Sequence, residues 1–496
     1  MKKTVSILLT VLVFGLLLSE MSCKKDEFTN SSSAKLDFST DTVLFDTVFT
    51  TVGSATEVFT IFNRNDQPVK VSSIRIAGGT SSLFRINVDG ISGSSFTDIE
   101  IGANDSIFVF SEVTVDPNNQ NTPLVVSDSI LFETNGNLQK VNLVAWGQDA
   151  YFHRATDGGS AFFVCNENWN NDKPHVIYGL ALVDSGCILN INAGANVHLH
   201  PGSSLIVLSS GTLRVNGTIA QPVNIQGDRL GIDYANVPGQ WGKIWLSNYT
   251  HSNLVNGTKE IGPGSRNCVI QNAVIKNGTI GIQADTVYAP GDITLRMENT
   301  IVKNMSYNGI ACLGANVKAF NCVYANCGAQ TANLLIGGNY DFYHCTFANY
   351  WISGNRQDPA ISLNNYYETN VRRIDAKFYN CIVHGNLDNE LGVDSFPRAA
   401  PNQCNFLFDH SLLKLESSYA VSNSSFFNSI IKATGYNNRP GFKDITNNDF
   451  QLDSLSVAID AGDLNILSVD PVLNNDLKGI SRPQGPAPDL GAYEKQ

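Results

Sequence analysis

A short phrase recurs seven times between residues 267 and 431, and it constrains the fold more strongly than any other feature of the chain. In each copy a polar residue precedes a small one, and residues that are mostly aliphatic or aromatic follow. The copies begin at Asn272, Asn299, Asn321, His344, Asn380, His410 and Asn428. Three of the six steps between the small residues are 27, 22 and 23 residues long, close to one turn of a parallel β-helix. The longer steps leave room for loops, and the last, shorter step indicates a trimmed coil.

The residue types of this phrase suit the corner of a narrow solenoid. Stacked strands lie about 4.8 Å apart, so one column receives the same residue type in each turn. Asn tolerates the left-handed backbone of a tight bend, and its amide can bond to the Asn above and below. Short segments closed by Gly or Asn also lie between residues 189 and 225. We therefore expect a right-handed parallel β-helix over residues 151–496, with an N-terminal cap at about 151–185 that covers its open edge.

Residues 34–150 follow a different pattern. Alternating segments at 56–62, 69–76 and 106–115 are separated by Asn-, Gly- and Pro-containing turns. About seven short strands in roughly 115 residues are typical of an Ig-like β-sandwich. The phrases at 63–71, 105–107 and 144–147 resemble Ig-like modules at the base of exported bacterial proteins. That resemblance implies a spacer or docking domain, so the expected fold is all-β: an Ig-like sandwich followed by the β-helix.

The N-terminus has the pattern of an export signal. Lys2 and Lys3 precede an apolar run over residues 5–18, and Ser22-Cys23 ends it. A small residue before Cys at this distance resembles a bacterial lipobox, although Glu20 stands where an aliphatic residue is usual. We predict a signal peptide over 1–22, acylation of Cys23, and a Ser-rich tether over 23–33. The expected location is the outer membrane, with display at the cell surface as one possibility; an ordinary secretory signal is the alternative.

Length and charge limit the remaining possibilities. With 496 residues, the chain is too long for one core. Its formal net charge of −12 argues against a nucleic-acid partner. No apolar run after residue 20 is long enough to cross a bilayer. The oligomeric state is not predicted.

Three cysteines occupy the small-residue position of the repeat, namely Cys322, Cys345 and Cys381. We expect them to be free thiols buried in one inward column, as Ala, Thr and Ser are in the sister coils. Stacked neighbours also lie within disulfide range, so a bond between Cys322 and Cys345 is the alternative. The cysteine spacings do not fit a zinc site. His198 and His200 face one side of a strand without an evident third ligand.

The C-terminal residues carry a more specific resemblance. The segments 456–463, 476–479, 482–483 and 489–494 resemble the closing segment of a family of secreted, pectate-lyase-like β-helix proteins. With 239–242 and 348–351, the resemblance covers about residues 151–496 and implies a closing segment at about 455–496. Four acids lie in it: Asp460, Asp463, Asp476 and Asp489. We expect a network of turn carboxylates, with a calcium site as the alternative; no other cofactor is expected.

The repeat frame predicts two outward columns. Three positions after the small residue lie Lys276, Lys303, Ala325, Ala348, His384, Lys414 and Lys432. Four positions before it lie Arg296, Lys318, Asp341 and Lys377. The first column predicts a basic stripe. Such a stripe either binds the carboxylates or sulfates of a glycan or simply keeps the strand surface soluble.

The long step between the repeats at 345 and 381 predicts a loop of about 14 residues. Aromatic faces suit sugar rings, and Arg suits carboxylates, so we expect ligand contacts here. The candidates are Trp351, Arg356, Tyr366 and Tyr367. The alternative is a loop that only packs against the coil. Trp241 and Trp245 alternate along one strand, so one is expected in the core and one at the surface.

The family resemblance implies that the β-helix handles extended polysaccharides along its side. Paired aspartates of the galacturonan-hydrolase type do not occur. We therefore favour binding of a polysaccharide or a surface partner without chemistry. The alternative is a polysaccharide lyase acting on an acidic glycan, with Arg372, Arg373 or Lys377 as the base. A structural adhesin or envelope component is a further alternative.

Overall fold

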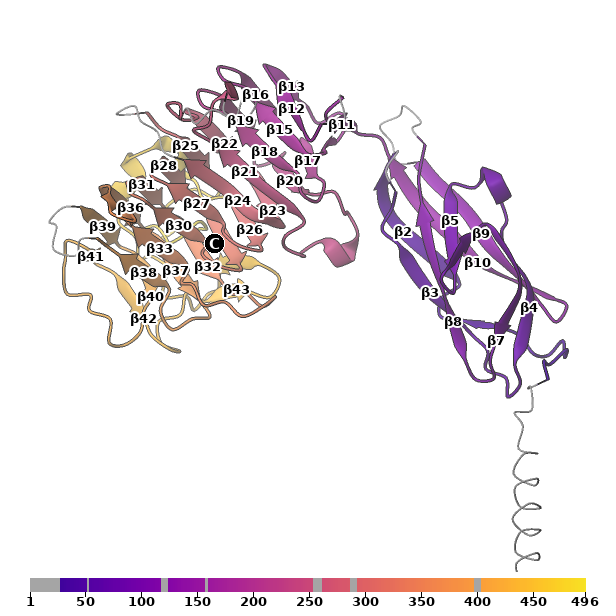
Figure 1. The fold of residues 1–496 in the computed structure, drawn as a ribbon. Coiled ribbons are helices and arrows are strands. Elements are labelled where there is room, and N and C mark those ends of the chain that lie inside the picture. Colours follow the sequence, from indigo (N-terminus) through magenta and orange to yellow (C-terminus); the bar gives the residue numbers. More distant parts are fainter. Residues whose placement is uncertain are drawn as a thin grey trace, which may run out of the picture. The chain divides into compact units, whose positions relative to one another are not determined.

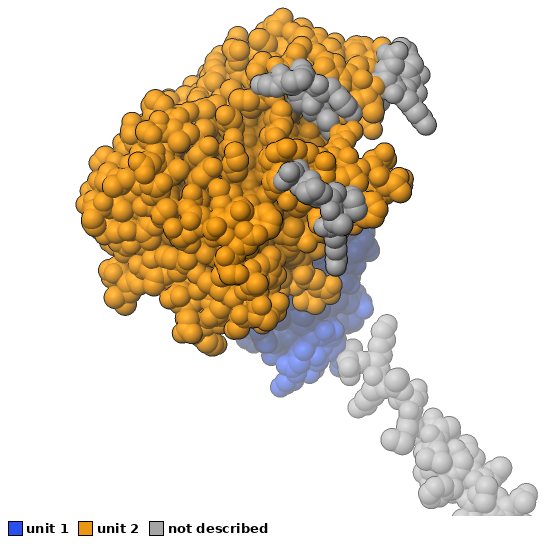
Figure 2. Space-filling view, turned by 90° about the vertical axis from the view of Figure 1, so that its left-hand side faces the viewer, with its two compact units in different colours: residues 1–148 blue, residues 149–496 orange. Residues whose placement is uncertain are grey.

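The computed structural model describes residues 27–50, 53–116, 124–156, 159–252, 261–285, 292–396 and 403–496 (Figure 1). The chain forms two compact units, residues 1–148 and 149–496 (Figure 2), so the division lies two residues before the expected one. Within the described residues, no helix combines the length and apolar character that crossing a membrane requires. The predicted signal peptide and Cys23 lie outside the described residues. The end of the predicted tether is hydrogen-bonded to the sandwich, because Thr29 N donates to Pro68 O and Asn137 Nδ2 donates to Ser32 O.

The first unit is the expected β-sandwich. One sheet has the order β1-β3-β8-β5-β6 and the other β2-β10-β9-β4-β7. The strands are β1 (Asp37–Phe38), β2 (Thr42–Phe49), β3 (Glu57–Phe62), β4 (Val69–Ile76), β5 (Phe84–Val88), β6 (Ile91–Gly93), β7 (Ser95–Ile101), β8 (Ser106–Val113), β9 (Leu124–Thr134) and β10 (Asn137–Gln148). All pairs are antiparallel except β2 with β10. Alternating residues such as Ile107 and Val109 form the core between the sheets.

The second unit is the expected parallel β-helix, with three parallel sheets that run along its sides (Figure 1). The first sheet contains β11 (Tyr151–His153), β14 (His175–Ile177), β17 (Asn196–Leu199), β20 (Val223–Gly227), β23 (Ala273–Lys276), β26 (Ile301–Met305), β29 (Val323–Cys327), β32 (Thr346–Asn349), β37 (Ile382–Gly385), β40 (Leu412–Lys414) and β42 (Ile431–Ala433). The second contains β12 (Ala161–Val164), β15 (Leu180–Val183), β18 (Ser204–Val207), β21 (Trp241–Leu246), β24 (Gly278–Asp285), β27 (Ile310–Leu313), β30 (Ala332–Leu335), β33 (Ile361–Asn364) and β38 (Leu391–Asp394). The third contains β13 (Glu167–Trp169), β16 (Ile188–Asn192), β19 (Thr212–Asn216), β22 (Cys268–Gln271), β25 (Leu295–Glu298), β28 (Asn316–Phe320), β31 (Gly338–Tyr343), β36 (Ile374–Tyr379), β39 (Cys404–Asp409) and β41 (Phe427–Asn428).

The repeated phrase forms the corner between the third and first sheets. Its polar residue has a left-handed backbone in every copy but the last, with φ between 42° and 53°. The predicted amide ladder is present where Asn321 Nδ2 donates to Asn299 Oδ1 at 3.0 Å. In the last copy the register slips by one residue. Ile431 pairs with Leu412, so Ser429, with φ 49°, takes the corner position.

The N-terminal end of the β-helix differs from the prediction. Strands β11, β12 and β13 pair in parallel with β14, β15 and β16. The residues expected to form a cap, about 151–185, therefore form the first coil and part of the second. A disulfide between Cys165 and Cys187, which was not predicted, joins these two coils. Each of these cysteines lies just before a strand of the third sheet.

The predicted column of thiols is confirmed. Cys322, Cys345 and Cys381 are free and fully buried in the core of the solenoid. Successive coils bond through their backbones, since Thr346 N donates to Cys322 O and Ile382 N to Cys345 O. The alternative disulfide between Cys322 and Cys345 is not formed.

The C-terminal segment lies along the side of the solenoid, where a closing segment at its end was expected. It contains the hairpin of β43 (Phe442–Asp444) and β44 (Asp449–Leu452). Phe450, Ala492 and Tyr493 pack on Ala325 and Ala348 of the first sheet. The C-terminal segment therefore covers the side of the coils built from residues 320–412, and we call it the lateral cover.

This cover changes the interpretation of the predicted basic column. The column is in register, because Lys276 pairs with Lys303, and the row continues through Ala325 and Ala348 to His384. Only Lys432 departs from the row, because it pairs with Leu413. The row is not an exposed stripe, since the alanines lie beneath the C-terminal segment and Lys414 Nζ donates to Gly385 O in a buried position. A continuous exposed basic stripe, which both the glycan-binding and the solubilising interpretation assumed, is therefore not formed.

Three of the four C-terminal acids form the expected network of turn carboxylates, and the fourth, Asp460, takes part through its backbone amide. Asp489 accepts bonds from the amides of Asp460 and Lys495, and Asp476 accepts bonds from those of Lys478, Ile480 and Glu494. Asp463 accepts a bond from the amide of Asn465. Backbone amides thus occupy these carboxylates as hydrogen-bond donors, and the acids fix the turns of the lateral cover.

Candidate functional site

The second sheet carries a row of outward side chains that changes along the solenoid. From β18 to β33 the row reads Ile206, Trp245, Gln283, Ala311, Asn333 and Ser362. The side chains after Trp245 become smaller, so the face of the sheet is lowered on that side of the indole. At about 4.8 Å per rung, the row from Trp245 to Ser362 is about 19 Å long.

A cleft of about 810 Å³ includes Trp245 and Gln283 of this row and extends along the C-terminal ends of β24, β27 and β30. Its lining includes Trp245, Tyr249, Gln283, Asp285, Tyr367 and Arg372. The last two come from the hairpin of β34 (Tyr366–Tyr367) and β35 (Asn370–Val371), which follows β33. The hairpin therefore supplies one wall of the cleft, and strands of earlier coils supply the floor.

A hydrogen-bonded network fixes the floor of the cleft. Trp245 Nε1 donates to Asp285 Oδ2 at 2.8 Å, and Gln283 Nε2 donates to Asp285 Oδ1 at 3.0 Å. Lys243 Nζ donates to Gln283 Oε1 at 2.7 Å and lies 4.3 Å from the centre of the indole ring. Tyr249 meets the same indole edge-on, with ring centres 5.4 Å apart. The indole is thus held in one orientation before any ligand arrives.

Burial changes the protonation behaviour of this network. Desolvation raises the pKa of Asp285, and the bonds from Gln283 and Trp245 oppose the rise. Desolvation also lowers the pKa of Lys243, with Asp285 acting in the opposite direction. Asp285 is the one carboxylate, and Arg372 the one cation, among the cleft-lining residues that the structure describes.

The predicted loop is two separate loops. Strand β33 returns to the second sheet between them, so residues 350–360 form one corner and residues 365–373 the next. Tyr367 and Arg372 lie at the cleft, and the Tyr366 hydroxyl donates to Asp394 Oδ2 at 2.6 Å. Trp351 lies at the other corner, against the backbone of Gly328. The structure therefore does not bring the four predicted ligand contacts together.

Arg356 was predicted as a ligand contact but is buried. Its guanidinium bonds to both carboxylate oxygens of Glu390, at 2.8 and 2.6 Å, and also to Asn386 Oδ1. Burial of the cation beside its partner makes Arg356 a structural support of the corner loop. The prediction is wrong for this residue, because sequence spacing could not show that Glu390 lies beneath it.

The three candidate bases of a lyase do not converge. Arg373 forms an exposed ion pair with Asp375 at 2.6 Å. Lys377 lies on the third sheet in the predicted column, paired in register with Asp341. Only Arg372 lines the cleft. The carboxylates from neighbouring coils that a lyase site needs are not among the described lining residues.

The remaining sequence candidates are resolved as follows. Trp241 is in the core and Trp245 is half-buried at the cleft, as the alternation predicted. His198 is buried and lies 3.1 Å from Gly227 O, whereas His200 lies 2.6 Å from Asp228 Oδ2. Among the residues that the structure describes, no three His, Cys, Asp or Glu side chains are grouped as a metal site requires.

Sequence reasoning missed Gln283 and Asp285 as site residues. They alternate outward along β24, which is an ordinary strand pattern. Their position beside Trp245 follows from the register of β21 with β24, almost 40 residues apart in sequence. Strands β22 and β23 lie between β21 and β24 in the sequence, and the repeated phrase begins only at Asn272, after β21, so it did not give the register of Trp245.

Comparisons with known proteins find only distant structural similarities. No family model matches the chain, and no curated protein matches it in sequence. Among solved structures, tailspike protein 2 of bacteriophage CBA120 matches at 12% identity and a TM-score of 0.32, covering 64% of this chain and half (50%) of that one. A GH87 α-1,3-glucanase from Streptomyces thermodiastaticus matches at 9% identity and 0.26, covering 77% and 89%. The PapD-like domain 7 of human CEP192 matches at 12% identity and 0.17, covering 26% and 92%.

These similarities are too low to carry an argument about activity. The fold class is therefore assigned from the order and pairing of the strands. The chain is an all-β protein in which an antiparallel, Ig-like sandwich precedes a parallel β-helix of three sheets.

Proposed function

We propose that the β-helix binds an extended polysaccharide in the cleft over its second sheet. The observation that carries this proposal is that one cleft contains both aromatic rings and side chains that can form hydrogen bonds with sugar hydroxyls. Trp245, Tyr249 and Tyr367 offer ring faces and edges, and Gln283 and Asp285 offer a donor and acceptors for sugar hydroxyls. A cleft along several rungs fits a chain of sugars better than a single small molecule.

The charges of the cleft favour an uncharged glycan. A uronate polymer requires several cations to balance its carboxylates. Arg372 is the one cation among the described lining residues, and Asp285 repels an acidic ligand. A lyase acting on an acidic glycan, the alternative function, is therefore disfavoured by the same residues.

Isothermal titration of the full chain tests this proposal. The ligands are cellotetraose, laminaritetraose, maltotetraose and, as the acidic comparison, tetragalacturonate. Trp245→Ala is expected to weaken binding of the neutral ligand by tenfold or more, about 1.4 kcal/mol, because the fixed indole face is lost. Tyr436→Ala removes a highly exposed aromatic residue outside the cleft and serves as the matched control. Equal affinities in wild type and Trp245→Ala, or tighter binding of tetragalacturonate, contradict the proposal.

We also propose that the chain is exported and anchored to the outer membrane through a lipid on Cys23. The support is the basic start, the apolar run and the Ser22-Cys23 pair in the sequence. Such an anchor places a glycan-binding β-helix at the envelope, where polysaccharide or a surface partner is met. Cys23→Ser is expected to move the protein from the membrane fraction to the soluble fraction. Retention of that variant in the membrane overturns the anchor.

A further inference from the structure

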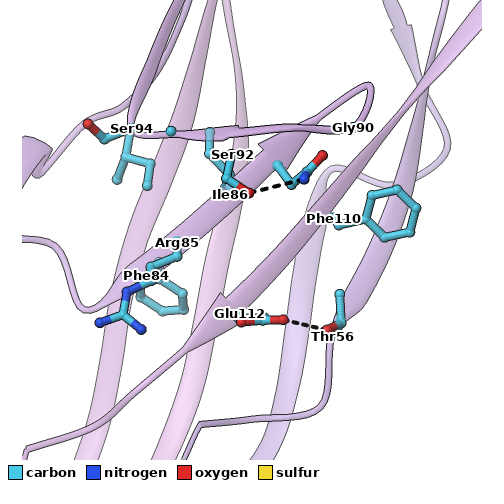
Figure 3. Close-up of a pocket in the computed structure, with 12 residues that line it drawn as sticks. Thr56, Phe84, Arg85, Ile86, Gly90, Ser92, Ser94, Phe110 and Glu112 are labelled. Atoms are coloured by element: carbon cyan, nitrogen blue, oxygen red, sulfur yellow. Dashed lines mark hydrogen bonds between the residues drawn. The ribbon is translucent and has the colours of Figure 1, made fainter.

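The sandwich contains a second cavity, of about 530 Å³, on the sheet that includes β5 and β8 (Figure 3). Its lining includes Thr56, Arg85, Asn87, Ser92, Phe110 and Glu112. They come from β5, β6 and β8 and from the residue that precedes β3, all within one compact unit. A spacer domain has no need of such a cavity, so its lining requires an explanation.

Aromatic side chains at this face point into solvent. Along β8 the core takes Ile107 and Val109, so Phe108 and Phe110 face outward, 52% and 41% exposed. Val58, on the neighbouring strand β3, pairs with Phe110 and is also exposed. Neighbouring exposed aromatic residues on one sheet face are unfavourable in water and mark a surface that is used for binding.

Polar side chains around Phe110 are already held in place. Thr56 Oγ1 donates to Glu112 Oε1 at 2.6 Å, and Asn87 Nδ2 donates to Ser92 Oγ at 3.1 Å. Figure 3 shows Phe110 at one end of the cavity and Arg85 at the other. The cavity therefore offers a flat apolar ring, hydrogen-bond acceptors and a fork of donors along its length.

We propose that this cavity is a second saccharide-binding site, which takes a short stretch of a neutral glycan. One sugar ring lies against Phe110, and the hydroxyls of the next reach Glu112 and Arg85. One cation and one anion among the described lining residues give the cavity no net charge, which fits hydroxyl groups and selects against a polyanion. This assignment goes beyond the cleft in the β-helix, because it gives the sandwich a binding role of its own.

An added peptide strand fits this site less well than a sugar. Strand addition needs a long free edge with unpaired backbone groups. The edge strand beside the cavity, β6, has only three residues. The carbonyl of Ser94, which follows β6, already accepts a bond from Ile76 N at 3.1 Å. The side chains, rather than the edge, are thus the part of this face that is available for recognition.

Titration of the full chain with the same neutral tetrasaccharides tests the inference through the number of sites. Wild type is expected to bind two molecules per chain, and Phe110→Ala and Trp245→Ala one each. Arg85→Gln is expected to weaken the sandwich site at least fivefold. Leu138→Ala, an exposed apolar residue of the opposite sheet, is the matched control and is expected to keep both sites.

The outcomes separate this inference from the proposed function of the cleft. One site per chain that Trp245→Ala abolishes overturns the sandwich site and leaves the cleft. One site that Phe110→Ala abolishes supports the sandwich site and overturns the cleft. Two sites that survive Phe110→Ala and Arg85→Gln overturn the location proposed here, and the absence of binding by all three tetrasaccharides overturns both assignments.

Discussion

Replacing Arg356 with Met leaves the carboxylate of Glu390 buried without its cation. The two side chains are 1% and 0% exposed, so water does not screen the pair. Arg356 also donates to the carbonyls of Asp358 and Asn349, and these acceptors lose their partner too. Arg356 therefore joins the corner loop that begins after β32 to the next coil, together with the bond from Asn386 Nδ2 to Trp351 O.

The size of the effect follows from what remains bonded to Glu390. Breaking one partner of a buried ion pair costs about 3–5 kcal/mol. The amides of Ala360 and Leu387 still donate to Glu390, at 2.8 and 2.9 Å, so we expect the lower end, about 3 kcal/mol. With an unfolding entropy of about 2.1 cal/mol/K per residue over residues 149–496, this corresponds to a fall of about 4 °C in the unfolding midpoint.

Calorimetry of the variants measures this fall. The double variant Arg356→Met/Glu390→Gln removes the uncompensated charge and is expected to recover at least half of the loss. Arg373→Gln breaks an exposed ion pair and is the control, with an expected loss below 1 kcal/mol. Oligosaccharide affinity is expected to stay unchanged in Arg356→Met. A fall no larger than that of Arg373→Gln, or no recovery in the double variant, refutes the reasoning.

Three further predictions concern the solenoid. Asn380 has a left-handed backbone, with φ 53°, and its side chain bonds to His344 and to the backbone of Asp463. Asn380→Ala should therefore lower the free energy of unfolding by about 2–4 kcal/mol, and Asn380→Gly, which tolerates this φ, should cost about 1 kcal/mol less. Equal losses for the two variants in urea denaturation contradict the left-handed corner. Burial lowers the pKa of His198 from 6.5 to about 4, so between these values its imidazole is protonated only in the unfolded chain; this residue alone should lower stability by about 2 kcal/mol from pH 7 to pH 5, beside the contributions of His153 and His384, whose pKa values burial also lowers, and His198→Asn, unfolded in urea at both pH values, should lose that part of the slope. The thiols of Cys322, Cys345 and Cys381 should react with iodoacetamide only after denaturation, and labelling of any of these three in the native chain, located by mass spectrometry, argues against the buried column.

The architecture was predictable because each turn of a solenoid requires the same backbone conformation at its corner. Asn299 and Asn321 stand where the backbone must be left-handed, so their recurrence marks the corner. The register of the outward columns followed from the same spacing, as the pairing of Arg296 with Lys318 shows. The predicted register of the repeated phrase failed only in its last copy, where Ser429 takes the corner position because the last coil is shorter.

The chemistry of the surface was harder to predict, because a repeat does not show which face another segment covers. Lys276 and Lys303 have the spacing of a basic stripe, but their row continues beneath Phe450 and Tyr493, more than 100 residues later in the chain. The aromatic loop was misjudged for a related reason. Its middle, β33, carries ordinary strand residues that rejoin the second sheet and separate Trp351 from the cleft.

The cleft itself arises from contacts between distant coils. Trp245 was recognised as one of two alternating tryptophans, and Tyr367 as part of an aromatic loop. Their meeting depends on a hairpin after β33 that reaches back over earlier rungs, which no local pattern encodes. Asp285 carries no sequence signal beyond alternation, yet it accepts the bond that orients the indole.

The most direct test of glycan binding in the cleft is a crystal structure of the full chain soaked with the tetrasaccharide that binds best in titration. The expected result is sugar density over the second sheet, with one ring against Trp245, a hydroxyl bonded to Gln283 or Asp285, and Tyr367 on the opposite wall. Sugar bound along the third sheet or on the C-terminal cover, with the cleft empty, contradicts the account.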